Sequence, residues 1–231
     1  MGLALRQRGT LTEKDSTISA MVGALMGLLA FFLAFAIGFA LNNYTTRRSL
    51  VVSESNAIGT AYLRAGLLDD STRDPVRELL REYTNLRLAG LDPAQFNTAV
   101  ARSEDIHDEL WVLTESYAKQ HPESEIAGLY VASINEVIDL HSTRVSANRS
   151  LRIPDIFIWL MTGIIIFSFF LIGVATSADG HRNLLALIVF ALAFAAAITL
   201  LVDIDSPQTG LIEVGQSAML SLQETIGTPM P

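Results

Sequence analysis

Three long apolar runs dominate the pattern of the chain. They cover residues 18–41, 155–177 and 184–202, and their only ionisable side chain is Asp155, at the start of the second run. Because about 20 apolar residues span the hydrocarbon core of a bilayer, each run predicts a transmembrane helix. Only residues 178–183 separate the last two runs, so we expect these two helices to form a tight antiparallel hairpin.

The first run is too long to be the apolar part of a cleaved signal peptide. Such a part has about 7–15 residues, whereas this run is free of charge from Ile18 to Leu41. The residues that follow, Asn42, Asn43 and Tyr44, also differ from the small residues of a cleavage site. We therefore expect an uncleaved membrane anchor.

Residues 42–153 carry a helical pattern of a different kind, in which apolar residues recur three or four positions apart among polar ones. Aspartate followed by proline is typical of a helix start, and this pair occurs at Asp74-Pro75 and at Asp92-Pro93. Pro122 breaks the pattern before a last run that leads into the second span. Two spans that extend out of the membrane, closed by two shorter helices, predict a four-helix bundle.

The predicted fold class is therefore an all-α integral membrane protein with three spans and a helical extramembrane bundle. The first span should continue as a helix to about Leu68. We divide the chain into a short polar N-terminal segment, three transmembrane helices, the bundle and an acidic C-terminal tail. The segment covers residues 1–17, the helices 18–41, 155–177 and 184–202, the bundle 42–153 and the tail 203–231.

Composition agrees with a membrane protein and narrows its partners. Half of the 231 residues are hydrophobic and 17% are charged, and the mean hydropathy is +0.38, whereas soluble domains carry about 25% charged residues. The net charge of −8 argues against a nucleic-acid partner. The sequence has no cysteine, which excludes disulfides, thiolate metal sites and a cysteine nucleophile. The expected partner is the lipid bilayer.

Basic residues in short segments predict the orientation, because cytoplasmic segments are enriched in them. Arg6, Arg8 and Lys14 precede the first span, Arg182 lies in the hairpin loop, and the tail has neither Lys nor Arg. This bias places the N-terminus in the cytoplasm and the bundle outside it. The opposite orientation is favoured by basic residues that flank the membrane on the bundle side, namely Arg47, Arg48, Arg144, Arg149 and Arg152.

Small residues mark one side of the first span. They are Gly23, Gly27, Ala30, Ala34 and Gly38. Spacings of this kind let helix backbones approach closely in lipid. One interpretation is packing against the hairpin of the same chain. The other is a seam between subunits or the lining of a pore.

Three polar residues share a helical face where the first span leaves the membrane: Asn43, Arg47 and Glu54. One interpretation is anchoring at the membrane interface, and the other is a polar ring at the mouth of a pore in an oligomer. The spans have no ionisable residue between Phe157 and Val202 except in the loop. Proton-coupled transporters usually mark their path with such residues, so this absence argues against that class of protein.

Candidate chemistry is sparse. Glu104 and His107 have the Glu-x-x-His spacing of di-iron proteins, but such a site needs a second copy, and acidic residues surround this one. His121 precedes a proline in a loop, and His141 and His181 lie close to the membrane, where we interpret them as interfacial polar residues. No nucleophile elbow, phosphate loop or dinucleotide motif occurs. We predict no enzyme activity, no cofactor and no metal site.

Two segments resemble the bestrophin-like domain family of bacteria and plants. The first comprises residues 43–44, 52–58 and 62–65, and the second is residues 202–214, with Asp205, Pro207 and Gly210 as its signature. The resemblance implies a protein of the bacterial plasma membrane and a distant kinship with bestrophins, which are oligomeric anion channels. Our first hypothesis is therefore a homo-oligomer with channel-like activity. The alternative is a non-conducting accessory or sensor subunit of a membrane complex.

The signature after the last span also has a structural interpretation. Pro207 fixes one backbone angle and Gly210 tolerates left-handed angles, so both favour a turn. Asp205 can accept backbone N–H bonds there. Leu211 and the apolar residues after it should then pack the tail against the bundle.

Overall fold

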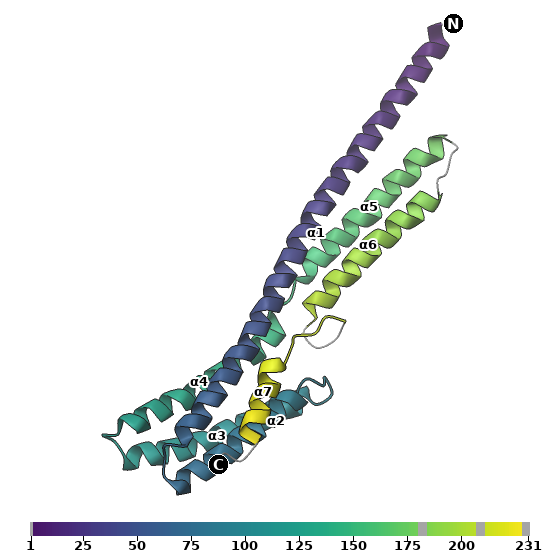
Figure 1. The fold of residues 1–231 in the computed structure, drawn as a ribbon. Helices are drawn as coiled ribbons and strands as arrows, with labels where there is room; N and C mark the ends of the chain where they lie inside the picture. The colour runs from purple at the N-terminus through teal and green to yellow at the C-terminus, as the bar shows by residue number, and fades with distance from the viewer. Residues whose placement is uncertain (1, 180–183, 207–210, 228–231) are drawn as a thin grey trace. The chain divides into compact units, whose positions relative to one another are not determined.

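The computed structural model describes residues 2–179, 184–206 and 211–227 (Figure 1), and these residues form seven helices and no strand. The all-α prediction is confirmed. The helices are α1 (Gly2–Ala65), α2 (Asp70–Ala89), α3 (Phe96–Gln120), α4 (Glu125–Ser150), α5 (Asp155–Asp179), α6 (Leu184–Asp205) and α7 (Ser217–Gly227). The chain divides into two units, which we name the membrane unit (1–42 and 152–205) and the bundle unit (43–151 and 206–231).

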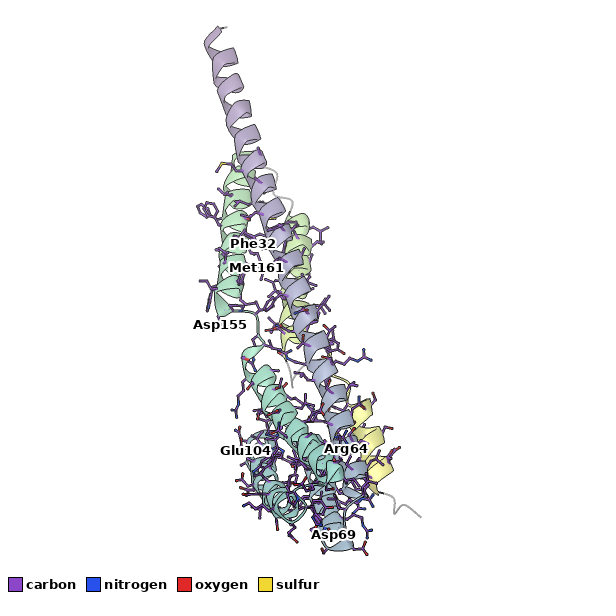
Figure 2. The ribbon with its side chains drawn as sticks, turned by 90° about the vertical axis from the view of Figure 1, so that its left-hand side faces the viewer. Phe32, Arg64, Asp69, Glu104, Asp155 and Met161 are labelled. Atoms are coloured by element: carbon purple, nitrogen blue, oxygen red, sulfur yellow. The ribbon has the colours of Figure 1, made fainter. Side chains whose placement is uncertain are left out.

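The membrane unit contains the three apolar helices. Segments of α1, of α5 and of α6 are each long and apolar enough to cross a bilayer, and α5 and α6 lie side by side in opposite directions (Figure 1). One face of α1 packs inside this unit through Leu29, Ala36 and Ala40, which are at most 2% exposed. Met161 of α5 and Leu201 of α6 are also buried, and Figure 2 labels Met161 with Phe32 of α1.

The bundle unit holds a hydrophobic core built by five helices. Ile58 of α1, Leu80 of α2, Ile106 of α3 and Ile134 of α4 are fully buried in it. At the C-terminal end of α1, Arg64 donates a hydrogen bond of 2.7 Å to the carbonyl of Leu129 (Figure 2 labels Arg64). Four of these helices are those that the apolar period predicted.

Helix α7 was not predicted, because we expected only that the acidic tail would turn after the last span and pack against the bundle. Met219 and Ile226 of α7 are buried in the core of the bundle unit. Ser55 of α1 also donates a hydrogen bond of 2.9 Å to the carbonyl of Ala218. The tail therefore completes the bundle. Of the apolar residues that we expected to pack, Val214 lies against this core, whereas Leu211 is 96% exposed.

Two predicted helix starts are shifted. Helix α2 begins at Asp70, before the expected start at Asp74-Pro75, and Pro75 lies inside it. The side chain of Asp69 accepts hydrogen bonds from the hydroxyls of Ser71 and Thr72, so this earlier aspartate organises the first turn. Helix α3 begins at Phe96, later than expected.

The later start of α3 also follows from an aspartate. The side chain of Asp92 accepts a hydrogen bond of 2.9 Å from the backbone N–H of Ala94, which forms a turn ahead of the helix. Helix α4 begins as a capped helix, with the side chain of Ser124 accepting from the N–H of Ala127. It ends at Ser150, and residues 151–154 separate it from α5.

The signature after the last span is described only in part. The carboxylate of Asp205 accepts a hydrogen bond of 2.9 Å from the backbone N–H of Ile153, which lies just before α5. The bond joins the start of the second span to the end of the third. Pro207 and Gly210 lie outside the described residues.

Candidate functional site

A buried carboxylate stands at the centre of the bundle unit. Glu54 of α1 is fully buried, and its two oxygens face two arginines. Nη1 of Arg144, on α4, lies 2.5 Å from one oxygen, and Nε of Arg87, on α2, lies 2.9 Å from the other. The Arg144 contact is a hydrogen-bonded ion pair, whereas the N–H of Arg87 is misaligned for a hydrogen bond and its contact is ionic.

A tyrosine and a histidine extend this centre as a chain of hydrogen bonds. The hydroxyl of Tyr83 lies 2.5 Å from a Glu54 oxygen and 3.1 Å from Nδ1 of His141. Glu54 is ionised and can only accept, so the Tyr83 hydroxyl donates to it. The tyrosine oxygen then accepts from His141, which assigns the ring proton of His141 to Nδ1.

A second histidine completes the cluster. The ring of His107, on α3, packs 4.9 Å from the ring of Tyr83 and 4.7 Å from that of His141, measured between centroids. His107 is 6% exposed and His141 is 3% exposed. Neither Nε2 atom has a hydrogen-bond partner among the described residues. We name Glu54, Tyr83, Arg87, His107, His141 and Arg144 the Glu54 cluster.

Helical spacing explains how four helices bring these six side chains together. Residues three or four positions apart lie on the same helical face, as do Tyr83 and Arg87 of α2 and His141 and Arg144 of α4. On α1, Glu54 follows Val51 and precedes Ile58 on the buried face. The polar residues therefore occupy positions that the helical pattern assigns to the core.

The surroundings of Glu54 keep it charged. Burial raises the pKa of Glu54, but Arg87, Arg144 and the bond from Tyr83 lower it by more, so the pKa lies below its usual value. Burial and the adjacent carboxylate raise the pKa of Tyr83 well above its usual value. The glutamate is therefore an anion at pH 7 and the tyrosine a neutral donor.

The two histidines are neutral, because for them burial outweighs the attraction of the nearby carboxylate. Burial lowers the pKa of His107 to about 4. Burial and the neighbouring Arg87 lower the pKa of His141 to about 3. A second proton on either ring would add positive charge to a site that already holds two arginines for one carboxylate, so the cluster resists protonation.

An arginine-lined cavity adjoins the cluster within the bundle unit. It has a volume of about 30 Å³ and is lined by Arg47, Arg87, Arg144, Asn148 and Gln216, with an apolar wall that includes Val51, Leu91 and Phe96. Nη2 of Arg144 donates a hydrogen bond of 3.0 Å to the side-chain oxygen of Gln216, and Arg47 donates to the carbonyl of Leu151. No carboxylate occurs among the described residues that line the cavity.

The three residues proposed for a pore mouth lie in the bundle unit. Asn43, Arg47 and Glu54 share one face of α1, but that face is buried, with exposed fractions of 2%, 2% and 0%. Within the single chain they do not form an exposed ring. Their roles as interface anchors or as a pore mouth in an oligomer stay predictions.

The small residues of the first span are placed differently. Gly23, Gly27, Ala30, Ala34 and Gly38 are all exposed in the single chain. A Cβ atom added at any of the three glycines would meet no atom within 4 Å. This face of α1 is opposite to the one that packs inside the membrane unit, because helix positions advance by about 100° per residue.

Sequence reasoning missed most of the Glu54 cluster. We interpreted His141 as an interfacial residue and Arg144 as a membrane-flanking one, and we placed His107 on a solvated stretch; all three are buried in the bundle. The Glu-x-x-His pair does not converge, because Glu104 is exposed on the outside of the bundle (Figure 2) whereas His107 points inward. No group of metal-ligating side chains occurs among the described residues.

A signal for the cluster was present in the sequence. Tyr83, His107 and His141 each fall on the apolar stripe of their helix, where a polar side chain requires a buried partner. A search of the apolar stripes for polar residues would have identified these three residues as one group. Only their matching depth along three helices, which the sequence does not give, brings them to one point.

The fold and the site define an all-helical integral membrane protein, in which three apolar helices accompany a bundle with a buried charged centre. Residues 2–219 match the family model described as Bestrophin-like domain. Because the match covers nearly all of the 231 residues, the chain belongs to the bestrophin-like family, as the resemblance indicated. No curated protein and no solved structure matches the chain.

Proposed function

We propose that the protein is a non-enzymatic homo-oligomer with channel-like activity, in which copies of α1 meet in the membrane and small ions pass along their small-residue face. The observation that carries the proposal is the exposure of Gly23, Gly27 and Gly38, on the face of α1 that the chain's own hairpin leaves open. In lipid, small residues of this kind favour close packing between helices.

The number of spans supports an assembly. Three candidate spans occur among the described residues, and closely packed helices fill the space between them with side chains. An aqueous path through such a protein therefore requires several copies around an axis. Helix α1 is the best candidate to line that path, because its small residues leave room beside the backbone.

A flux measurement tests this proposal. Purified protein is reconstituted into liposomes that hold a gradient of a small salt, and release of the gradient is compared with that of protein-free liposomes. We expect release to increase with the amount of protein and to fall in a variant that does not assemble. Release equal to that of empty liposomes, from protein that is still assembled, would contradict channel-like activity.

A second candidate function is a non-conducting sensor subunit. It is favoured by the position of the titratable side chains, because the Glu54 cluster lies in the bundle unit while the apolar stretches carry no ionisable residue except Asp155 at the start of the second. A sensor would bind its partner or ligand at the bundle and need no path through the membrane. Assembly without flux, together with a co-purifying unlike chain, would favour this function.

A further inference from the structure

We propose that an apolar pocket in the membrane unit holds one acyl chain of a phospholipid, whose headgroup lies at the start of α5. The pocket lies between α1 and the segment that begins α5, and its lining belongs to the membrane unit alone. It is lined by Phe35, Ala36, Phe39, Ile153, Pro154 and Phe157. This site goes beyond the proposed function, because it does not depend on whether the protein conducts ions.

The lining of the pocket fits a hydrocarbon. All of its side chains are apolar, and two of them, Ala36 and Ile153, are only 2% and 6% exposed. Phe35 is 56% exposed, so the pocket opens at the surface of a helix that is apolar enough to cross a bilayer. The pocket has a volume of about 160 Å³, and apolar cavities of about 150 Å³ bind small hydrocarbons. A lipid tail is the hydrocarbon that a bilayer supplies there.

The sequence of α1 explains why a hollow forms at this point. Phe35 and Phe39 lie four positions apart and therefore share one side of the helix. The small side chain of Ala36 lies beside them and leaves space that a larger residue would fill. The ring of Phe157 approaches that of Phe35, with 6.2 Å between the ring centroids. Pro154 has no backbone N–H, so it adds apolar surface without adding a donor.

The pocket lies close to the expected edge of the membrane. Phe39 is near the end of the first apolar run, which ends at Leu41, and Phe157 is near the start of the second. Trp159 of α5 is 72% exposed, and exposed tryptophans are enriched at the boundary between lipid and water. A lipid whose acyl chain enters the pocket would therefore have its headgroup near the first turn of α5.

Two charged residues at the start of α5 fit a zwitterionic headgroup. Arg152 and Asp155 are both exposed, and neither side chain has a hydrogen bond or an ion pair among the described residues (Figure 2 labels Asp155). Arginine binds phosphate oxygens well, and a carboxylate accepts hydrogen bonds from an ammonium group. One charge of each sign matches a headgroup that carries a phosphate and an amine, as phosphatidylethanolamine does.

Native mass spectrometry of the full protein tests the site. The protein is stripped of lipid in mild detergent and incubated with dioleoylphosphatidylethanolamine, with dioleoylphosphatidylglycerol or with dioleoylglycerol, which share their acyl chains. We expect about one phosphatidylethanolamine per protein chain, less phosphatidylglycerol, and least dioleoylglycerol. Equal retention of phosphatidylethanolamine and dioleoylglycerol would overturn the proposal. Equal retention of the two phospholipids would overturn the role of Asp155.

Arg152→Gln tests the headgroup contact. This side chain is exposed and unpaired among the described residues, so its replacement should leave the fold intact. Because a hydrogen bond to a charged group contributes about 1.5–3 kcal/mol, we expect retention of phosphatidylethanolamine to fall about tenfold or more. Arg48→Gln is the matched control, because Arg48 is also exposed and also flanks the first span. An equal fall in both variants would show general attraction to lipid and contradict this site.

Alanines in the wall of the pocket test the contact with the acyl chain. Phe35→Ala with Phe39→Ala removes two rings that are 56% and 39% exposed, so the variant should still fold. We expect it to retain several times less phosphatidylethanolamine. The matched control is Phe167→Ala with Phe170→Ala, which removes two exposed rings of α5 outside the pocket and should keep the lipid.

The same wall variant separates a lipid from a second copy of the protein. A change in the mass of the particle, with unchanged retention of phosphatidylethanolamine, would assign the pocket to a contact between copies and overturn the proposal. Unchanged lipid retention at unchanged particle mass would overturn it as well. A loss of lipid in the wall variant and in Arg152→Gln, with both controls unaffected, is the result that we expect.

Discussion

The carboxylate of Glu54 lies 2.5 Å from Nη1 of Arg144, although 90 positions separate the two residues in the sequence. The pair joins α1, which carries the first span, to α4, which precedes the second. The two side chains are 6% and 0% exposed, and they touch directly without water between them. It makes the middle of the bundle unit a charged centre within an apolar core.

Removing the charge of Glu54 should therefore destabilise the bundle. Glu54→Gln keeps the shape of the side chain but leaves Arg87 and Arg144 buried without a counter-charge. The expected cost is about 3–5 kcal/mol, or a fall of roughly 10 °C in the melting temperature of a chain of this size. Glu104→Gln is the control, because Glu104 is exposed and should tolerate the change. Equal melting temperatures for both variants would show that the ion pairs contribute nothing.

The two buried histidines predict a loss of stability in acid. Their pKa values lie at about 4 for His107 and about 3 for His141 in the folded chain, whereas an unfolded histidine has a pKa of about 6.5. Between these values the unfolded chain binds more protons, so stability falls as the pH is lowered from 7 to 5. We expect each histidine to contribute about 2 kcal/mol to this loss.

Glu54 does not account for a loss in that range. Its lowered pKa keeps it ionised in the folded chain, and its stabilising effect is lost only when the pH falls below its unfolded value of 4.5. His107→Gln should therefore reduce the dependence of the melting temperature on pH between 7 and 5. His121→Gln, a change in an exposed histidine, should leave it as it is. An equal reduction in both would assign the effect to other groups.

The apolar runs sufficed to predict the spans, because a bilayer demands a length and a composition that few other structures share. The extension of α1 to Ala65 could also be predicted, since no proline occurs between Ile18 and Asp74. The helical pattern of α2 to α4 was readable too. The boundaries at Asp70 and Phe96 were not, because a side-chain bond from Asp69 or Asp92 decides where each first turn closes.

The Glu54 cluster and α7 show where sequence reasoning stops. A glutamate near a membrane is equally compatible with an exposed ring and a buried ion pair, and only the depth of Arg87 and Arg144 decides between them. The tail looked acidic as a whole, yet Met219, Leu222 and Ile226 pack α7 against the core. Both features depend on tertiary contacts that bring together residues far apart in the sequence.

The bond between Asp205 and Ile153 predicts a stabilising role for this aspartate. Asp205→Ala would leave the N–H of Ile153, a residue that is 6% exposed, without this acceptor. The expected cost is about 1–3 kcal/mol, measured as a fall in the melting temperature. Asp205→Asn keeps an oxygen acceptor and should retain most of the stability. An Asp205→Ala variant as stable as the unchanged protein would mean that the bond is unimportant.

Single cysteines test the orientation, since the chain has none of its own. A membrane-impermeant thiol reagent on intact cells should label a cysteine at Glu123 or Ser217, both exposed in the bundle unit. It should miss a cysteine at Thr10 or Asn183, which we place in the cytoplasm. Arg47 and Arg144, two residues that favoured the opposite orientation, are buried. The reverse labelling pattern would overturn the orientation and leave the three spans unchanged.

The most direct test of the proposed assembly is the mass of the particle in mild detergent. Leucines at Gly23 and Gly27 would hold neighbouring copies of α1 apart while keeping the span apolar. The matched control is Gly163→Leu with Gly173→Leu on α5, where an added side chain also meets no atom within 4 Å. We expect an oligomer for the unchanged protein and for the control, and a smaller species for Gly23→Leu with Gly27→Leu. An unchanged mass for the α1 variant would contradict a subunit seam on this face.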